Sequence, residues 1–148
     1  MKYDSTAETL KHIKQVNDFL INFSIELLKR AQKHDLSKLE SPEKELFDEM
    51  TPILENLEYG SVEYYKSLEK LKPALDHHYD NNSHHPQYYP NGVNDMTLID
   101  LIEMFCDWKA AVLRTKNGDI EKSIQINANR FDLSNQLTEI FTNTLKNN

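Results

Sequence analysis

TAETLKHIKQVNDFLINFSIELLKRAQKH, residues 6–34, is the longest periodic stretch of this chain and indicates the kind of fold. Its apolar residues recur at spacings of three and four, which predicts an amphipathic helix. The stretch is either one long helix or two helices broken near residues 22–24, where Ser24 could cap the second helix. The apolar positions are Leu10, Ile13, Val16, Phe19, Leu20, Phe23, Leu27, Leu28 and Ala31.

His12 and His34 favour one of these two alternatives. In a single straight helix they would lie about 33 Å apart, at about 1.5 Å per residue, and could not share a metal ion. If the chain reverses near Phe23, His12 lies eleven residues before the turn and His34 eleven residues after it. An antiparallel pair would then bring the two histidines level. We therefore predict a helical hairpin over this stretch.

The rest of the chain also has helical periodicity. Helices are expected from Pro42 to about Leu57, from Val62 to about Asp80, and from Thr97 to about Thr115, with one or two more between 120 and 146. Pro73 should kink or divide the second of these. Residues 81–96 form one long loop, and no stretch combines β-branched residues with period-two alternation. We predict an all-α fold, a single compact bundle of six or seven helices over residues 1–148.

Composition excludes several partners. The net charge is -7 and only three residues are arginine, which argues against binding of long nucleic acid. No apolar run approaches the ~20 residues that span a bilayer, and the start, MKYDSTAETLK, has no signal-peptide pattern. The lone Cys106 cannot form an internal disulfide, so we expect a cytoplasmic protein with no membrane partner. A small phosphorylated substrate stays compatible, because a bound metal can supply local positive charge.

Histidine is concentrated in one part of the chain. Four of the six histidines lie within the nine residues 77–85, and imidazole is the usual neutral ligand of transition metals. His78 follows Leu71, Ala74 and Leu75 at helical spacings, so its side chain should point inward. His77 projects about 100° away and is less suited as a ligand. The sequence does not separate His84 from His85 as the ligand.

Carboxylates complete the candidate set. His34 and Asp35 are neighbours at the end of the first helical stretch and together offer a nitrogen and an oxygen ligand. Asp107 lies in an apolar helical stretch, with Glu103 four residues and Asp100 seven residues before it. A carboxylate that faces a core is costly unless it is paired or binds a metal. The alternative for these three acidic residues is a solvated stripe.

In chain order, these residues resemble the H…HD…H…H…D signature of the HD-domain superfamily of metal-dependent phosphohydrolases, in its form with a larger, two-metal ligand set. Residues 34–38, HDLSK, are similar to the HDxGK run of HD-GYP phosphodiesterases, and residues 84–92 to their paired-histidine loop. The chain also resembles short phage and bacterial HD-like proteins with HDLSK, N-x-HHP and EM-x-x-DW runs. Here those runs are residues 34–38, 82–86 and 103–108.

This resemblance implies an HD-domain-like bundle that holds one or two divalent ions, of Mn, Fe, Co, Ni, Zn or Mg. It implies hydrolysis of a phosphate ester or anhydride in a small nucleotide, with Asp35 in the catalytic centre and Lys38 as a point charge for phosphate. Glu103 and Asn82 would orient ligand imidazoles. Two other functions stay open, an HD-type di-iron oxygenase and a non-catalytic phage or bacterial factor that binds a nucleotide or a protein. The implied metal ligands are His12, His34, Asp35, His78, His84, His85 and Asp107.

Overall fold

The computed structural model describes residues 3–57, 61–114 and 118–146. Within these ranges the chain forms six α-helices and three short 3-10 helices, with no strand, so the all-α prediction is confirmed. The chain divides into two compact units, Met1–His34 and Asp35–Asn148. The single domain over residues 1–148 stays a prediction. Among the described helices, none is both long and apolar enough to cross a membrane.

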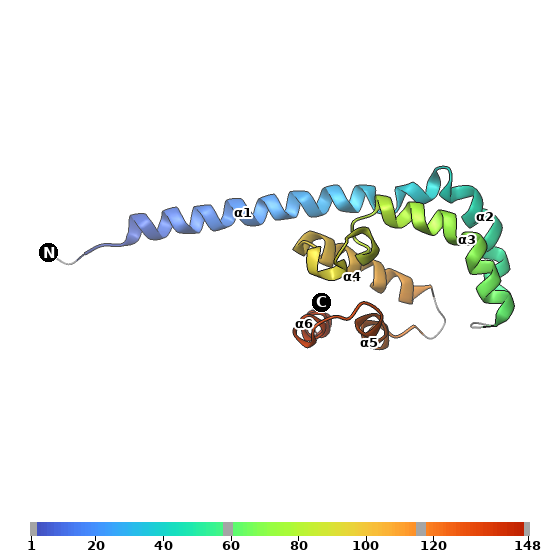
Figure 1. Cartoon of the computed structure of the whole chain (residues 1–148). Coiled ribbons are helices and arrows are strands. Elements are labelled where there is room, and N and C mark those ends of the chain that lie inside the picture. The colour runs from blue at the N-terminus through green and yellow to red at the C-terminus, as the bar shows by residue number, and fades with distance from the viewer. Residues whose placement is uncertain (1–2, 58–60, 115–117, 147–148) are drawn as a thin grey trace. The chain divides into compact units, whose positions relative to one another are not determined.

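The first unit is one uninterrupted helix, α1 (Thr6–Lys33), shown in blue in Figure 1. The predicted hairpin is therefore wrong. Residues 6–33 contain neither glycine nor proline, and Ser24 does not cap a new helix, because its hydroxyl donates to the Leu20 carbonyl one turn earlier, at 2.9 Å. His12 and His34 lie about 33 Å apart along this helix, so they cannot ligate the same ion within one chain.

In the second unit, η1 (Leu36–Leu39) leads into α2 (Glu43–Glu55) and α3 (Val62–Asn81), which pack against each other (Figure 1). Helix α2 begins one residue later than predicted, with Pro42 as its cap, and α3 begins after its cap Ser61 as expected. Pro73 lies inside α3 and does not divide it, because the helix is held on both sides of the proline by packing against α2. The core between these helices consists of Met50, Leu71 and Ala74.

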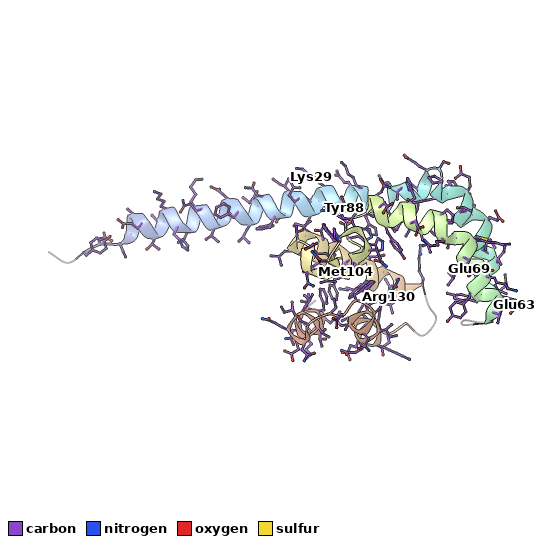
Figure 2. The ribbon with its side chains drawn as sticks, in the orientation of Figure 1. Lys29, Glu63, Glu69, Tyr88, Met104 and Arg130 are labelled. Atoms are coloured by element: carbon purple, nitrogen blue, oxygen red, sulfur yellow. The ribbon has the colours of Figure 1, made fainter. Side chains whose placement is uncertain are left out.

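The remaining elements are η2 (Pro86–Tyr88), η3 (Gly92–Asp95), α4 (Leu98–Leu113), α5 (Ile120–Arg130) and α6 (Asn135–Leu145). The tail thus forms two helices. Helix α5 contacts both α4 and α6. Thr97 and Asp100 form a capping box at the start of α4. The three helices enclose a second core (Figure 2, where Met104 is labelled). The buried residues of this core are Met104, Phe105, Trp108, Ile124 and Phe141.

Asp100 fixes the loop between α3 and α4. Its side chain is fully buried at the start of α4 and accepts hydrogen bonds from Ser83 Oγ at 2.8 Å, Tyr89 Oη at 2.8 Å and the Thr97 backbone N–H at 2.9 Å. Burial raises the pKa of Asp100, but these hydrogen bonds outweigh that effect and lower the pKa to about 2. Both ends of the loop are therefore tied to α4, and the histidines within it are held in place.

Candidate metal centre

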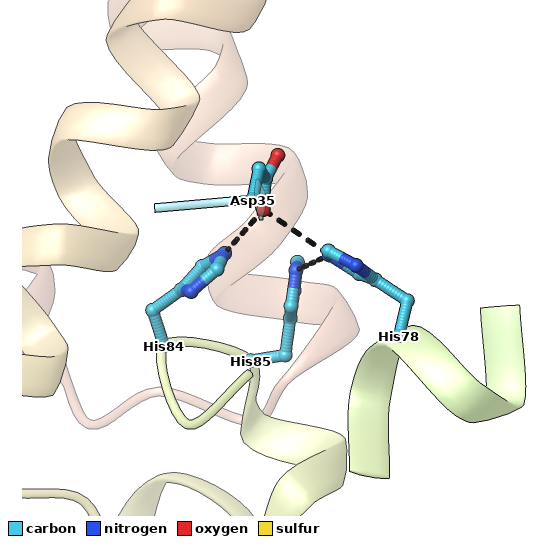
Figure 3. Close-up of side chains that lie close together, drawn as sticks. All are labelled: Asp35, His78, His84 and His85. Atoms are coloured by element: carbon cyan, nitrogen blue, oxygen red, sulfur yellow. Dashed lines mark hydrogen bonds and ion pairs between the residues drawn. The ribbon is translucent and has the colours of Figure 1, made fainter. Parts of the chain in front are cut away.

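Four side chains of the second unit converge on one point (Figure 3): Asp35, His78, His84 and His85, here called the His/Asp cluster. Each contributes one ligand atom, and these four atoms all lie within 4.8 Å of one another. Asp35 precedes η1, His78 lies in the last turn of α3, and the other two histidines come from the loop that follows α3. These residues could hold a metal ion.

The backbone at Asp35 turns its carboxylate toward the histidines. Asp35 has φ 57° and ψ 14°, a left-handed conformation that aspartate tolerates better than most residues. Its Oδ1 lies 3.3 Å from His78 Nε2 and 3.5 Å from His84 Nε2. Its Oδ2 pairs with Lys38 Nζ at 2.6 Å. The two oxygens thus have different surroundings, one the histidines and the other a lysine.

His78 is held by a buried carboxylate behind it. The His78 side chain is 2% exposed, and its Nδ1 lies 2.9 Å from Oε2 of Glu43, whose side chain is fully buried. Burial raises the pKa of Glu43, but hydrogen bonds, the strongest from His77, outweigh burial and lower it. The group is therefore an ionised acceptor at neutral pH. His78 must then carry its proton on Nδ1, which leaves the Nε2 lone pair directed into the cluster.

His84 has the same arrangement on the other side. Its ring is buried, its Nε2 faces Asp35, and its Nδ1 lies 3.3 Å from Oε1 of Glu103 on α4. Metal-ligating histidines usually place a carboxylate or carbonyl behind the ring in this way. Glu103 therefore lies where the sequence prediction needs it, behind an imidazole of the cluster.

His85 completes the cluster in its neutral form. Its Nε2 lies 2.9 Å from His78 Nε2, and its ring centroid is 4.1 Å from that of His84. Burial, together with the neighbouring His84 and His78, lowers the pKa of His85 to about 3. At neutral pH the ring is uncharged, which is the state that binds a metal ion.

The spacing of the ligand atoms matches that around a single ion. Atoms about 2.1 Å from an ion stand about 3.0 Å apart at octahedral angles and about 3.4 Å apart at tetrahedral angles. Three of the six separations are 2.9 Å between the Nε2 atoms of His78 and His85, and 3.3 Å and 3.5 Å from Asp35 Oδ1 to the Nε2 atoms of His78 and His84. These three fit a single ion, and the other three are at most 4.8 Å.

The acidic residues of α4 are not a solvated stripe. Asp100 is fully buried, the Glu103 side chain is 10% exposed, and Asp107 is half-buried. One carboxylate oxygen of Asp107 lies within 4.8 Å of one of Asp35. Glu103 and Asp107 therefore lie beside the candidate site, Asp100 binds the loop before α4, and the solvated alternative is wrong.

Several predicted residues thus meet in the second unit. The structure brings together Asp35, His78 and both loop histidines, with Lys38, Glu103 and Asp107 beside them. His12 and His34 belong to the first unit, and their roles as ligands stay predictions. Two aromatic side chains nearby have other contacts: Trp108 packs in the core of α4, α5 and α6, and the Tyr89 hydroxyl donates a hydrogen bond to Asp100.

Glu43 is the site residue that the sequence prediction missed. The pattern Ser41-Pro42-Glu43 is typical of a helix start, where a carboxylate is stabilised by the helix dipole. The structure shows it buried behind His78 instead. Leu46, Phe47 and Met50 follow Glu43 at spacings of three, four and seven. Apolar neighbours at such helical spacings were the reason to place His78 on an inward face. The same criterion, applied to Glu43, would have predicted that its side chain is buried.

Known proteins provide one point of comparison. The model of DUF5662, described as a family of unknown function, matches residues 1–147. No curated protein and no solved structure matches the chain. Since the match extends over nearly the whole sequence, the chain belongs to the DUF5662 family.

Proposed function

We propose that this protein is a metal-dependent phosphohydrolase that acts on a small nucleotide or another phosphate ester. The observation that carries the proposal is the His/Asp cluster, whose four ligand atoms lie within 4.8 Å of one another. Behind two of its imidazoles lie the carboxylates of Glu43 and Glu103. The resemblance to HD-domain phosphohydrolases, which rests on these same histidines and aspartates, points to the same function.

The donor set favours a transition metal ion. Three imidazole nitrogens and one carboxylate oxygen suit Zn²⁺, Fe²⁺, Mn²⁺, Co²⁺ or Ni²⁺. Mg²⁺ and Ca²⁺ prefer sets made mostly of oxygen ligands. We therefore propose that the resident ion comes from the first group and that Mg²⁺ binds weakly.

The chain's own residues would bind and orient the substrate. A divalent ion in the cluster would supply charge to polarise a phosphoryl oxygen and to acidify a bound water. Lys38, whose side chain is 37% exposed, lies 2.6 Å from Asp35 Oδ2 and places a cation beside the site. Because the net charge of the chain is -7, a phosphorylated substrate depends on such local positive charge. Lys38 can therefore pair with a substrate phosphate at the edge of the site.

Metal analysis combined with a substrate screen tests the proposal. Purified protein should contain about one or two transition metal ions per chain, and should release phosphate or a nucleotide from at least one nucleoside phosphate or cyclic dinucleotide. Asp35→Asn should lose both the ion and turnover, because it removes the ligand charge. Asp76→Asn is the matched control, since Asp76 is an exposed carboxylate on α3 that pairs with Lys72. This control should keep the ion and the activity.

Three other results of this experiment would each contradict part of the proposal. Equal metal content in wild type and Asp35→Asn would contradict the metal centre itself. Bound iron with oxygen-dependent turnover and no hydrolysis would identify an oxygenase. A bound ion without any turnover would identify a binding protein. Either of the last two results would overturn the phosphohydrolase proposal while leaving the metal centre in place.

A further inference from the structure

We propose that Glu43 is the positioning residue of this site, which fixes His78 in the tautomer that presents Nε2 to a metal ion. The inference rests on the proposed metal centre and goes beyond its ligands. Glu43 does not belong to the His/Asp cluster, and it would act only through His78. Its substitution should therefore change metal affinity without removing a ligand.

The contacts of Glu43 leave one arrangement of protons. Its Oε1 lies 2.8 Å from His77 Nδ1 and its Oε2 lies 2.9 Å from His78 Nδ1. A carboxylate accepts hydrogen bonds and has no proton to donate, so both Nδ1 atoms must carry a proton. Neutral His78 then has its lone pair on Nε2, which faces Asp35 Oδ1 at 3.3 Å.

Two neighbours of His78 would favour the opposite tautomer. The Ser37 hydroxyl lies 3.2 Å from His78 Nδ1 and can donate to a lone pair there, and Asp35 Oδ1 lies 3.3 Å from Nε2 and can accept from a proton there. Asn82 does not compete, because its two amide hydrogens go to Ser37 Oγ at 2.9 Å and to the His78 carbonyl at 2.8 Å. The charge-assisted bond from His78 Nδ1 to Glu43, at 2.9 Å, is shorter than either opposing contact. Without Glu43, the proton would move to Nε2 and point at the other ligand atoms.

Two substitutions separate this role from a structural one. Glu43→Met keeps the length of the side chain and removes the acceptor, so Ser37 and Asp35 should determine the tautomer of His78. Glu43→Gln keeps one acceptor oxygen. That oxygen can face His78, because the amide NH₂ can donate to His77, whose side chain is 40% exposed and can direct Nε2–H to water. Glu43→Gln should therefore rescue the site.

The first readout needs no metal, and its decisive measurement is made on the wild type. In metal-free wild type, the ¹⁵N imidazole spectrum should show His78 with a protonated Nδ1 and an unprotonated Nε2. Glu43→Met should shift His78 toward the Nε2–H form, and Glu43→Gln should keep the wild-type pattern. His78 with Nε2–H in the wild type would overturn the proposal, whether or not any variant folds.

The second readout is the affinity for Co²⁺, followed by its visible absorption. Glu43→Met should weaken binding about 10–100-fold, the usual effect of losing the group behind a ligand histidine. Glu43→Gln and the control Asp76→Asn, at an exposed carboxylate of α3 paired with Lys72, should bind within a few-fold of wild type. Unchanged affinity in Glu43→Met would overturn the positioning role and leave the metal centre standing. Absence of Co²⁺ binding in wild type would instead overturn the metal centre. Binding without phosphate hydrolysis would leave the role of Glu43 intact and overturn the proposed activity alone.

Discussion

Asp35 combines two requirements in one residue. Its backbone is left-handed, at φ 57°, and its Oδ1 faces the histidines of the cluster. Glycine would satisfy the first requirement and most other residues would satisfy neither. Aspartate is among the few side chains that tolerate this conformation and can also ligate an ion. The turn after α1 and the metal centre therefore depend on the same position.

Substitution of Asp35 can separate these requirements. Asp35→Gly and Asp35→Ala should both lose the bound ion. In metal-free buffer, however, the free energy of unfolding of Asp35→Gly should be about 1 kcal/mol higher than that of Asp35→Ala. The left-handed conformation costs alanine about 1–2 kcal/mol, and the larger unfolded-state entropy of glycine offsets part of that difference. Urea denaturation measures both values. A more stable alanine variant would contradict the backbone argument.

At the scale of elements, the start of α4 controls the loop that carries His84 and His85. Asp100 joins this helix to both ends of the loop through buried hydrogen bonds. Its pKa is about 2 in the folded protein, compared with an ordinary value of 3.8. A lowered folded-state pKa means that the ionised group stabilises the fold above pH 3.8, and that this stabilisation is lost as the pH falls toward 2.

A pH series on Asp100→Asn tests this link. Between pH 5 and pH 2, the unfolding free energy of wild type should fall by about 2 kcal/mol more than that of the variant. Glu43, whose pKa is also lowered, contributes to the acid loss in both proteins and cancels in the comparison. Chemical denaturation at each pH gives the two slopes. Parallel slopes would show that Asp100 does not stabilise the fold through its charge.

Helix α1 is the element in which the predicted and observed structures differ most. Spin labels at Lys14→Cys and Lys29→Cys, in a Cys106→Ser background, should give a distance near 22 Å along one straight helix. A hairpin would bring the labelled segments to about 10 Å, the spacing of packed helices. Pulsed dipolar spectroscopy measures this distance. Singly labelled protein is the control for distances between chains, and a short distance confined to the doubly labelled protein would contradict the continuous helix.

At the scale of the second unit, the His/Asp cluster connects two separate cores. Met50, Leu71 and Ala74 form one core between α2 and α3, and a different set of residues fills the core of α4, α5 and α6. His78 comes from α3, and His84 is backed by Glu103 of α4. An ion in the cluster would therefore cross-link parts of the unit that have little shared hydrophobic packing.

Metal binding should for that reason stabilise the second unit as a whole. At a free ion concentration 100 times the Kd, the stabilisation is about 2.7 kcal/mol, which raises the Tm by roughly 10 °C for a unit of this size. Differential scanning calorimetry with Zn²⁺ or Mn²⁺, before and after a chelator, measures the shift. Mg²⁺ on wild type, and any of these ions on Asp35→Asn, should give little change. An equal shift in that variant would place the ion elsewhere.

Local patterns in the sequence were enough to predict most of the helices and the inward direction of His78. Apolar spacing depends on residues a few positions apart, so the run before His78 already contains that information. The same patterns could not show whether α1 reverses, since periodicity is identical in one helix and in two. The preference for a hairpin came from assuming a shared ion, and that assumption failed.

The role of Glu43 and the joining of Asp35 to three imidazoles were decided only by tertiary structure. Glu43 and His78 are 35 residues apart, and they meet because α2 packs along α3. Burial then turns a carboxylate typical of a helix start into a hydrogen-bond acceptor for two histidines. Composition and spacing determined that the chain is helical and rich in metal-binding side chains. Packing of distant segments determined which of those side chains share one site, because ligand geometry depends on distances that no local pattern specifies.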